Sequence, residues 1–253
     1  MSLMIYQCDT LGAHLTTCAM GGGSTAIHDV VNEAVAGVMR QVFPPQLVLS
    51  NHDDIRAHLL QRFQLPLDAR LPFPVPDIMT LGEETLYIDT RITDPRGAIN
   101  LNLGATAVDA GGDGAGVSAE AAAKKKRADY APAIEANYMQ ESQFVALVME
   151  HGGRPSKSAD EFFHRLARLY EAKLTNLPPN EKLGPAGNRF LTLLRQIVSA
   201  ALHKATSQRI LTCADRVLFT RAARVREAEL GGGDSGFRVL TAADIAEAVG
   251  GFG

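Results

Sequence analysis

The sequence predicts an α/β protein in which helices flank one mixed β-sheet, and three observations lead to this fold class. A helical pattern with one apolar stripe precedes three short segments that have strand character. A second helical pattern separates these segments from a continuous apolar run at 144–149, which is typical of a buried strand. Only helical patterns follow, so we expect the order helix, strand, strand, strand, helix, strand, with a helical C-terminal extension.

The first helix is expected to begin near residue 24 and to end before Pro44 and Pro45, which cannot continue a helix. Ser24 or Thr25 can cap its N-terminus. Apolar residues at helical spacing predict its buried face: Ile27, Val30, Val31, Ala34 and Val38. A short strand at 46–49 and a short helix at 53–63 follow.

The period then changes from helical to extended. Residues 74–79 contain two prolines and predict an extended segment, while residues 85–92 alternate and are rich in β-forming side chains. Gly82 lies in the short connection expected to join them as a hairpin. A Gly/Asp-rich loop is expected at 109–116.

Helical patterns occupy most of the remaining chain. The pattern at 118–139 is rich in Ala and Lys, with Pro132 weakening its middle. After the apolar run, helices are expected at 159–174, 185–208, 210–230 and 241–249. We expect three parts: an N-terminal segment at 1–24, a core at 25–175 and a helical extension at 176–253.

Composition and charge exclude several classes of protein. Hydrophobic residues make up 46% of the 253 residues and charged residues 21%, so wholesale disorder is not expected. No apolar run is long enough to cross a membrane, and the first residues lack the basic region of a secretory signal. The net charge of −3 provides no overall basic field for nucleic acid. Three cysteines cannot all pair, so they are interpreted as thiols or metal ligands.

Asp77 and Asp89 are the first candidates for chemistry. Each lies in one of the two extended segments, and neighbouring strands would bring their carboxylates to one end of the sheet. Two carboxylate ligands suit Mg²⁺, which keeps several waters and binds phosphate. The alternative is structural: Asp77 would cap a turn and Asp89 would face solvent from its strand.

Two further residues could assist this site. A lysine of the basic run Lys124-Lys125-Lys126-Arg127, on the next predicted helix, could hold a scissile phosphate or orient a metal-bound water, although such runs are also typical of a solvated helix face. Glu33, on the polar side of the first helix, could complete a metal site or could be a surface side chain.

The N-terminal segment contains a candidate zinc site. Cys8, His14 and Cys18 are thiolate and imidazole ligands at short spacing, and His28 is a possible fourth ligand. A paired first cysteine is missing, so an ordinary loop with two buried thiols is the alternative.

These pieces stand in an order that resembles the proteins of non-LTR retrotransposons. Residues 11–18, followed by Gly21-Gly22 and by His28 in a helix start, are similar to their zinc knuckle and the helix after it. Residues 75–78 and 87–94 resemble the core of their restriction-like endonuclease domain. Two later segments of this chain, 126–130 and 144–150, are similar to the helix and the strand that follow this core in the family. The helical stretch 191–210 resembles the end of that domain.

The resemblance covers roughly residues 5–212 and implies the PD-(D/E)XK fold, with Asp77, Asp89 and Lys126 as the core triad. It implies Mg²⁺-dependent nicking of DNA, a structural Zn²⁺ ion and an intracellular, nuclear location. The chain departs from the family pattern around the knuckle and the first helix, at Cys8, Ala13, Ile27 and Asp29, and it is too short to include a polymerase domain.

Two functions follow from these observations. The first is a metal-dependent DNA endonuclease that uses the Asp77–Asp89 pair. The second is a catalytically inactive, domesticated subunit that keeps the nuclease fold as a scaffold in a larger nucleoprotein assembly. Convergence of both carboxylates with Lys126 would favour the first, because fold alone does not decide function.

Overall fold

The computed structural model describes residues 23–82, 85–94, 116–176, 178–179 and 182–230. The chain divides into two compact units, 1–210 and 211–253. The first unit contains the whole sheet and every residue discussed below. The predicted zinc segment, the predicted helix at 241–249 and nearly all of the predicted loop at 109–116 lie outside the described residues. No described helix is both long and apolar enough to cross a bilayer.

Four strands form one mixed sheet, as the sequence predicts. They are β1 (Val48–Leu49), β2 (Ile78–Thr80), β3 (Tyr87–Thr93) and β4 (Phe144–Glu150), in the spatial order β1-β2-β3-β4. The first three strands pair antiparallel, and β4 lies parallel to β3 with Asp89 opposite Ala146. A parallel pair needs a crossover connection, and the helix between β3 and β4 supplies it.

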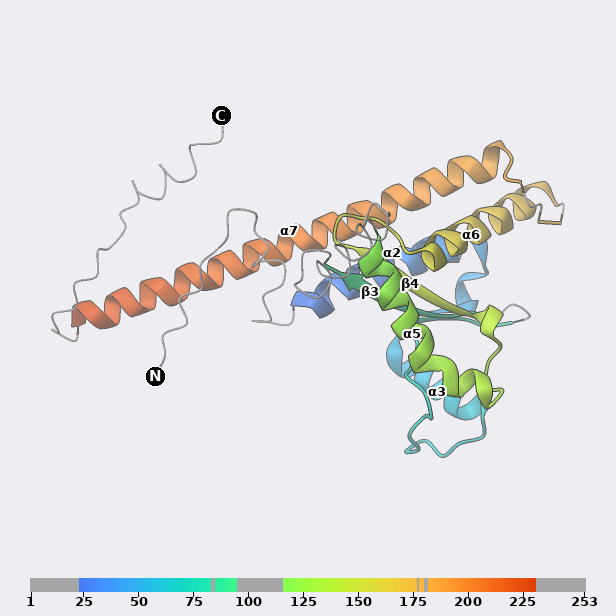
Figure 1. Cartoon of the computed structure of the whole chain (residues 1–253), viewed down its shortest axis with the longest axis horizontal. Helices are drawn as coiled ribbons and strands as arrows, with labels where there is room; N and C mark the ends of the chain where they lie inside the picture. Colours follow the sequence, from blue (N-terminus) through green and yellow to red (C-terminus); the bar gives the residue numbers. More distant parts are fainter. Residues whose placement is uncertain (1–22, 83–84, 95–115, 177, 180–181, 231–253) are drawn as a thin grey trace, which may run out of the picture. The chain divides into compact units, whose positions relative to one another are not determined.

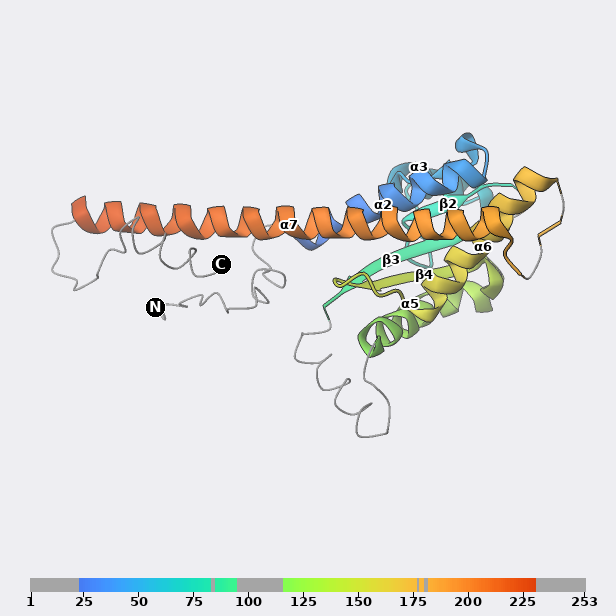
Figure 2. The same cartoon turned by 90° about the horizontal axis from the view of Figure 1, so that it is seen from above.

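Helices cover both faces of this sheet (Figures 1 and 2). One face is covered by α2 (Gly23–Val42), by α6 (Lys157–Thr175) and by the first part of α7 (Pro185–Leu230). The other face is covered by α3 (His52–Arg62) and by α5 (Val117–Glu135). Because β4 is covered on both sides, all seven of its residues are buried, which explains its continuous apolar run.

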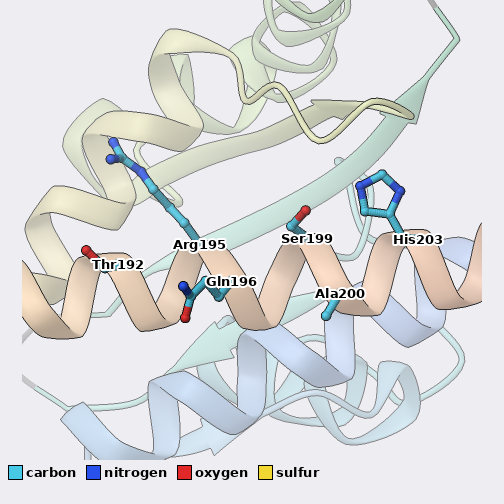
Figure 3. A pocket seen from close by; sticks show the side chains of 6 residues that line it. All are labelled: Thr192, Arg195, Gln196, Ser199, Ala200 and His203. Atoms are coloured by element: carbon cyan, nitrogen blue, oxygen red, sulfur yellow. The ribbon is translucent and has the colours of Figure 1, made fainter.

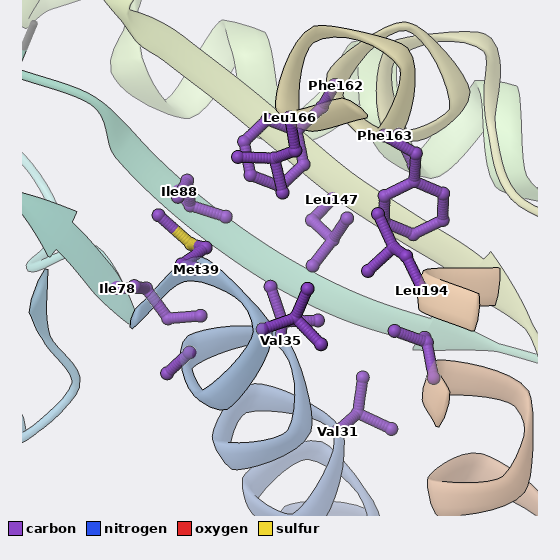
Figure 4. Close-up of a cluster of buried hydrophobic side chains, with 14 of the residues drawn as sticks. Val31, Val35, Met39, Ile78, Ile88, Leu147, Phe162, Phe163, Leu166 and Leu194 are labelled. Carbon is purple, nitrogen blue, oxygen red and sulfur yellow. The ribbon is translucent and has the colours of Figure 1, made fainter. Parts of the chain in front are cut away.

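The larger apolar cluster lies between the sheet and helices α2, α6 and α7 (Figure 4). From α2 it takes side chains three or four residues apart: Ile27, Val31, Val35, Val38, Met39 and Val42. The prediction that Val30 belongs to this face is wrong, because the buried stripe advances mostly by four residues and leaves Val30 37% exposed.

Two differences from the predicted elements have local causes. The helices expected at 185–208 and 210–230 are one continuous helix, α7, because no proline interrupts the chain between them. The helix expected at 118–139 ends at Glu135, three residues after Pro132. The first part of α7 contributes Phe190, Leu194 and Leu202 to the core, so packing continues past residue 175.

Candidate active site

Asp77 lies where the chain enters β2 and is held there by backbone and side chain. Its N–H donates to the carbonyl of Ile88 at 2.9 Å, which extends the pairing of β2 with β3 by one residue. Its Oδ2 atom accepts from the N–H of Thr90 at 2.6 Å and faces Nε2 of His28 at 3.0 Å. Three elements, β2, β3 and α2, therefore fix this carboxylate.

Asp89 lies within β3 and points toward α5. Side chains alternate along a strand, so Asp89 shares a face with the buried Tyr87, while Ile88 enters the cluster under α2. Lys126 of α5 donates from Nζ to Asp89 Oδ1 at 2.6 Å. The structure thus brings together Asp77, Asp89 and Lys126, the three residues that the resemblance singles out.

The two carboxylates have different electrostatic surroundings. Burial raises the pKa of Asp89 to about 6; Lys126 opposes this shift, and the neighbouring Asp77 carboxyl adds to it. Burial also acts to raise the pKa of Asp77, but the hydrogen bond and positive charge of His28 outweigh it, so the pKa of Asp77 is lowered. The same hydrogen bond raises the pKa of His28 to about 9, against the opposing effect of burial. At neutral pH, His28 and Asp77 therefore form an ion pair.

Tyr130 adds a buried hydroxyl on the α5 side of the site. Burial raises its pKa far above the ordinary value, and the charges of Asp89 and Asp77 add to this effect, so the hydroxyl stays protonated and able to donate. Its ring stacks on Phe144 with the centroids 4.3 Å apart. Among the described residues Tyr130 Oη makes no hydrogen bond of ordinary geometry, although it lies near enough to the Asp89 carboxylate for that group to add to the rise in its pKa.

These residues fit a hydrated divalent cation. Mg²⁺ is commonly held by one or two carboxylates and completes its shell with water and phosphate oxygens. No set of three or more His, Cys, Asp or Glu side chains within the described residues is arranged to hold a metal ion, so two carboxylates and water is the donor set that this site offers. Tyr130 Oη, Thr90 Oγ1 and Asn32 Oδ1 are buried without a partner in the described structure, and such groups are normally satisfied by ordered water.

Two other predicted site residues, Glu33 and His28, have other partners in the described structure. Glu33 contacts Arg40 at 2.9 Å and Ser50, and its side chain is 68% exposed. It follows His28 by five residues, which rotates it about 140° around α2 and away from Asp77. His28, considered above as a zinc ligand, is instead held at Asp77, and the three other proposed zinc ligands lie outside the described residues.

Residues that the sequence reasoning did not assign to this site surround the carboxylates. Tyr130 lies four residues after Lys126, a spacing that places both on one face of α5. Arg91 is exposed on β3, and its spacing of two residues places it on the face of Asp89. The sequence shows that Tyr130 shares a helix face with Lys126 and that Arg91 shares a strand face with Asp89. This spacing identifies Tyr130 and Arg91 as site residues only when Lys126 and Asp89 are already known to belong to the site.

A separate hollow lies along α7 (Figure 3). It has a volume of about 530 Å³ and is lined by Thr192, Arg195, Gln196, Ser199, Ala200 and His203. Arg195 donates to Asp160 Oδ1 of α6 at 2.5 Å, so its charge is already compensated. This hollow contains no carboxylate pair and is not part of the candidate site.

Comparison of the chain with protein-family models, with curated proteins and with solved structures found no match.

Proposed function

We propose that this protein is a metal-dependent endonuclease that nicks DNA. The observation that carries the proposal is the contact of Lys126 with the buried Asp89 at 2.6 Å, beside the partly buried carboxylate of Asp77. An ordinary surface ion pair contains one exposed acid, whereas this site contains two adjacent acids that are mostly buried. The repulsion and desolvation that raise the pKa of Asp89 are typical of functional sites.

The order of elements supports the same proposal. A helix, three antiparallel strands, a crossover helix and a parallel strand form the core, and the two acids lie at β2 and on β3. This is the arrangement that the resemblance to restriction-like endonucleases implies. We therefore propose the PD-(D/E)XK fold for this core.

Each residue of the site has a role in this chemistry. Asp77 and Asp89 would hold Mg²⁺, which when bound polarises the scissile phosphate and a water molecule. Lys126 stabilises the negative charge that develops on the phosphate as the P–O bond breaks. Tyr130 donates a hydrogen bond that orients water near Asp89, and His28 fixes the direction of the Asp77 carboxylate.

A nicking assay on supercoiled plasmid tests the proposal. Wild-type protein should convert the plasmid to open circles with Mg²⁺ and not with EDTA, and Asp77→Ala and Asp89→Ala should each abolish nicking without unfolding the chain. Asp160→Asn, on α6 and outside the candidate site, is the matched control and should retain activity. Residual nicking in both alanine variants would show that other residues carry the reaction.

One observation favours the second function, a non-catalytic scaffold in a nucleoprotein assembly. His28 and Lys126 already neutralise Asp77 and Asp89, so the site is electrostatically compensated by the protein itself. Wild-type protein that binds DNA but never nicks it, with Mg²⁺, Mn²⁺ or Co²⁺, would favour the scaffold.

We also propose that Cys8, His14 and Cys18 bind a structural Zn²⁺ ion. Thiolate and imidazole are the ligands that zinc prefers, and their spacing in the sequence is short. Elemental analysis of protein purified without chelator should find one zinc ion per chain. Absence of zinc from such protein would overturn this proposal and leave the nuclease proposal unaffected.

A further inference from the structure

A second hollow, of about 860 Å³, lies along the segment that leads into the candidate active site. Its polar and exposed lining comes from two places: His52 and Arg56 on α3, and Asp68, Arg70, Pro72 and Pro74 on the connection to β2. The last lining residue, Val75, precedes Asp77 by only two residues. We call this hollow the α3 groove.

The wall of the α3 groove is an irregular segment that bends at Pro72 and Phe73. Leu71 and Phe73 are buried in the cluster under α3 and α5, whereas Pro72 and Pro74 between them are exposed. The two prolines restrict the backbone, because each ring fixes φ. Phe73 packs edge-on against Phe63 with the ring centroids 6.0 Å apart.

Arg56 ties the groove to α3. Its two terminal nitrogens donate to the carbonyls of Leu67 at 3.1 Å and Ala69 at 2.9 Å. These bonds hold the chain just before Leu71, and the two carbonyl groups that accept them are uncharged. The position of the groove relative to Asp77 is therefore set by fixed backbone.

Charge in the α3 groove favours an anionic occupant. Arg56, Arg70 and one carboxylate, Asp68, line the groove, together with His52, whose ring lies 3.8 Å from the exposed Asp53 carboxylate. Arg70 is exposed, and no ion pair or hydrogen bond of its side chain is found among the residues that the structure describes. An exposed arginine above a rigid apolar floor suits a phosphodiester backbone, which presents charge and sugar carbon together.

We propose that the α3 groove binds the sugar-phosphate backbone of DNA beside the cleavage position, with Arg70 as the principal phosphate contact. This inference rests on the proposed function, because it assigns the groove to the substrate of the Asp77–Asp89 site. Arg70 precedes Asp77 by seven residues, which span at most about 23 Å of extended chain. At 3.4 Å of helix axis per nucleotide on one strand, the contacted phosphate lies within about seven nucleotides of the cut.

The test measures DNA binding without cleavage. Fluorescence anisotropy with a labelled 30-base-pair duplex in EDTA compares wild type with Arg70→Glu and with Arg189→Glu. Arg189 is an exposed arginine on α7, a helix that covers the other face of the sheet, so it controls for net charge. Arg70→Glu should weaken binding about fivefold or more and should lower the salt dependence of log Kd by about one, as expected for loss of one phosphate contact. Arg189→Glu should change Kd less than about twofold.

Several outcomes would overturn the groove proposal. One is an unchanged Kd for Arg70→Glu, and another is an equal loss of DNA affinity in Arg70→Glu and Arg189→Glu. A third is displacement of the labelled duplex by a polyglutamate peptide as effectively as by unlabelled DNA. The nicking assay is independent of this result. Loss of nicking in the aspartate variants with normal Arg70-dependent binding supports both proposals. Arg70-dependent binding without any nicking by wild type overturns the nuclease proposal and leaves the groove as a DNA-binding surface without an adjacent cleavage site.

Discussion

Two buried polar clusters lie on the same face of β3, and they differ in how completely the protein satisfies them. In the first, Asp89 shares its surroundings with a second carboxylate, Asp77, and with the unpartnered hydroxyl of Tyr130. In the second, Ser118 donates to Glu150 Oε1 at 2.7 Å and lies 3.3 Å from Thr93 Oγ1.

The difference separates a structural cluster from a candidate site. The Ser118 cluster fastens the start of α5 to the ends of β3 and β4, and each polar side chain in it has a partner. In the Asp89 cluster two acids, Asp77 and Asp89, lie close together, and the buried Tyr130 hydroxyl makes no hydrogen bond of ordinary geometry. Buried polar groups that are left under-satisfied cost stability, so their presence beside an ion pair supports the proposed ligand site.

The largest effect on the nicking rate is expected for Lys126→Ala, which tests whether the Asp89 cluster is catalytic or structural. Loss of a cation that stabilises the charge of the phosphate should slow nicking on the order of a hundredfold and should leave Mg²⁺ dependence in place. Single-turnover rates at saturating protein measure it, with Lys124→Ala as the control because Lys124 is exposed on the same helix. Equal rates for both variants would indicate that Lys126 serves only the fold.

The second effect concerns the buried hydroxyls. Tyr130→Phe keeps the ring that packs on Phe144 and removes the donor, so we expect nicking about tenfold slower, less than the loss of a direct transition-state donor costs, because Tyr130 acts through water. Tyr87→Phe is a close control, since Tyr87 is also fully buried and its hydroxyl also lacks a partner among the described residues. The half-saturating Mg²⁺ concentration should rise for Tyr130→Phe alone. An equal response of the two variants would contradict a specific role for Tyr130.

The third effect compares the stability of the two clusters. The pKa of Asp89 is raised from 3.8 to about 6, so its ionisation opposes folding increasingly as pH rises through that range. Asp89→Asn keeps an oxygen that can accept from Lys126 and should raise the free energy of unfolding at pH 8 by about 1 kcal/mol, with no gain near pH 4. Ser118→Ala should lower it by about 1–2 kcal/mol, because Glu150 loses its donor. Urea denaturation measures both, and destabilisation by Asp89→Asn at pH 8 would contradict this account.

The smallest effect concerns the His28–Asp77 ion pair. Because the folded-state pKa of His28 is raised from 6.5 to about 9, its stabilisation is complete below pH 6.5 and is lost as pH rises through 9. After allowance for solvent screening of this partly exposed pair, the contribution is about 1 kcal/mol. The stability difference between wild type and His28→Gln, followed by denaturation from pH 6 to pH 10, should shrink across that range. A difference that does not change with pH would exclude the ion pair.

Local patterns in the sequence determined most of the elements of this protein. The apolar stripe of α2, the alternating segment that becomes β3 and the continuous run that becomes β4 are each visible within a few turns or residues. The mixed character of the sheet followed from the order of these elements. Their periods are set by backbone geometry, which acts between near neighbours in the chain.

The composition of the site was only partly accessible from the sequence. Asp77 and Asp89 could be paired because they lie on consecutive extended segments. The approach of Lys126 to Asp89, across 37 residues, was suggested by a family resemblance and not by spacing. The contact of His28 with Asp77, across 49 residues, had no signal in the sequence.

Tertiary structure decided these contacts because they depend on how each helix is rotated against the sheet. The rotation of α2 that buries Val31 and Val35 turns His28 toward Asp77 and Glu33 toward Ser50. On α5, the burial of Ala119, Ala123 and Tyr130 aims Lys126 at Asp89. The helical period in the sequence indicates which residues share a face of the helix. Packing against strands that are distant in the sequence decides which of these faces is turned toward Asp77 and Asp89.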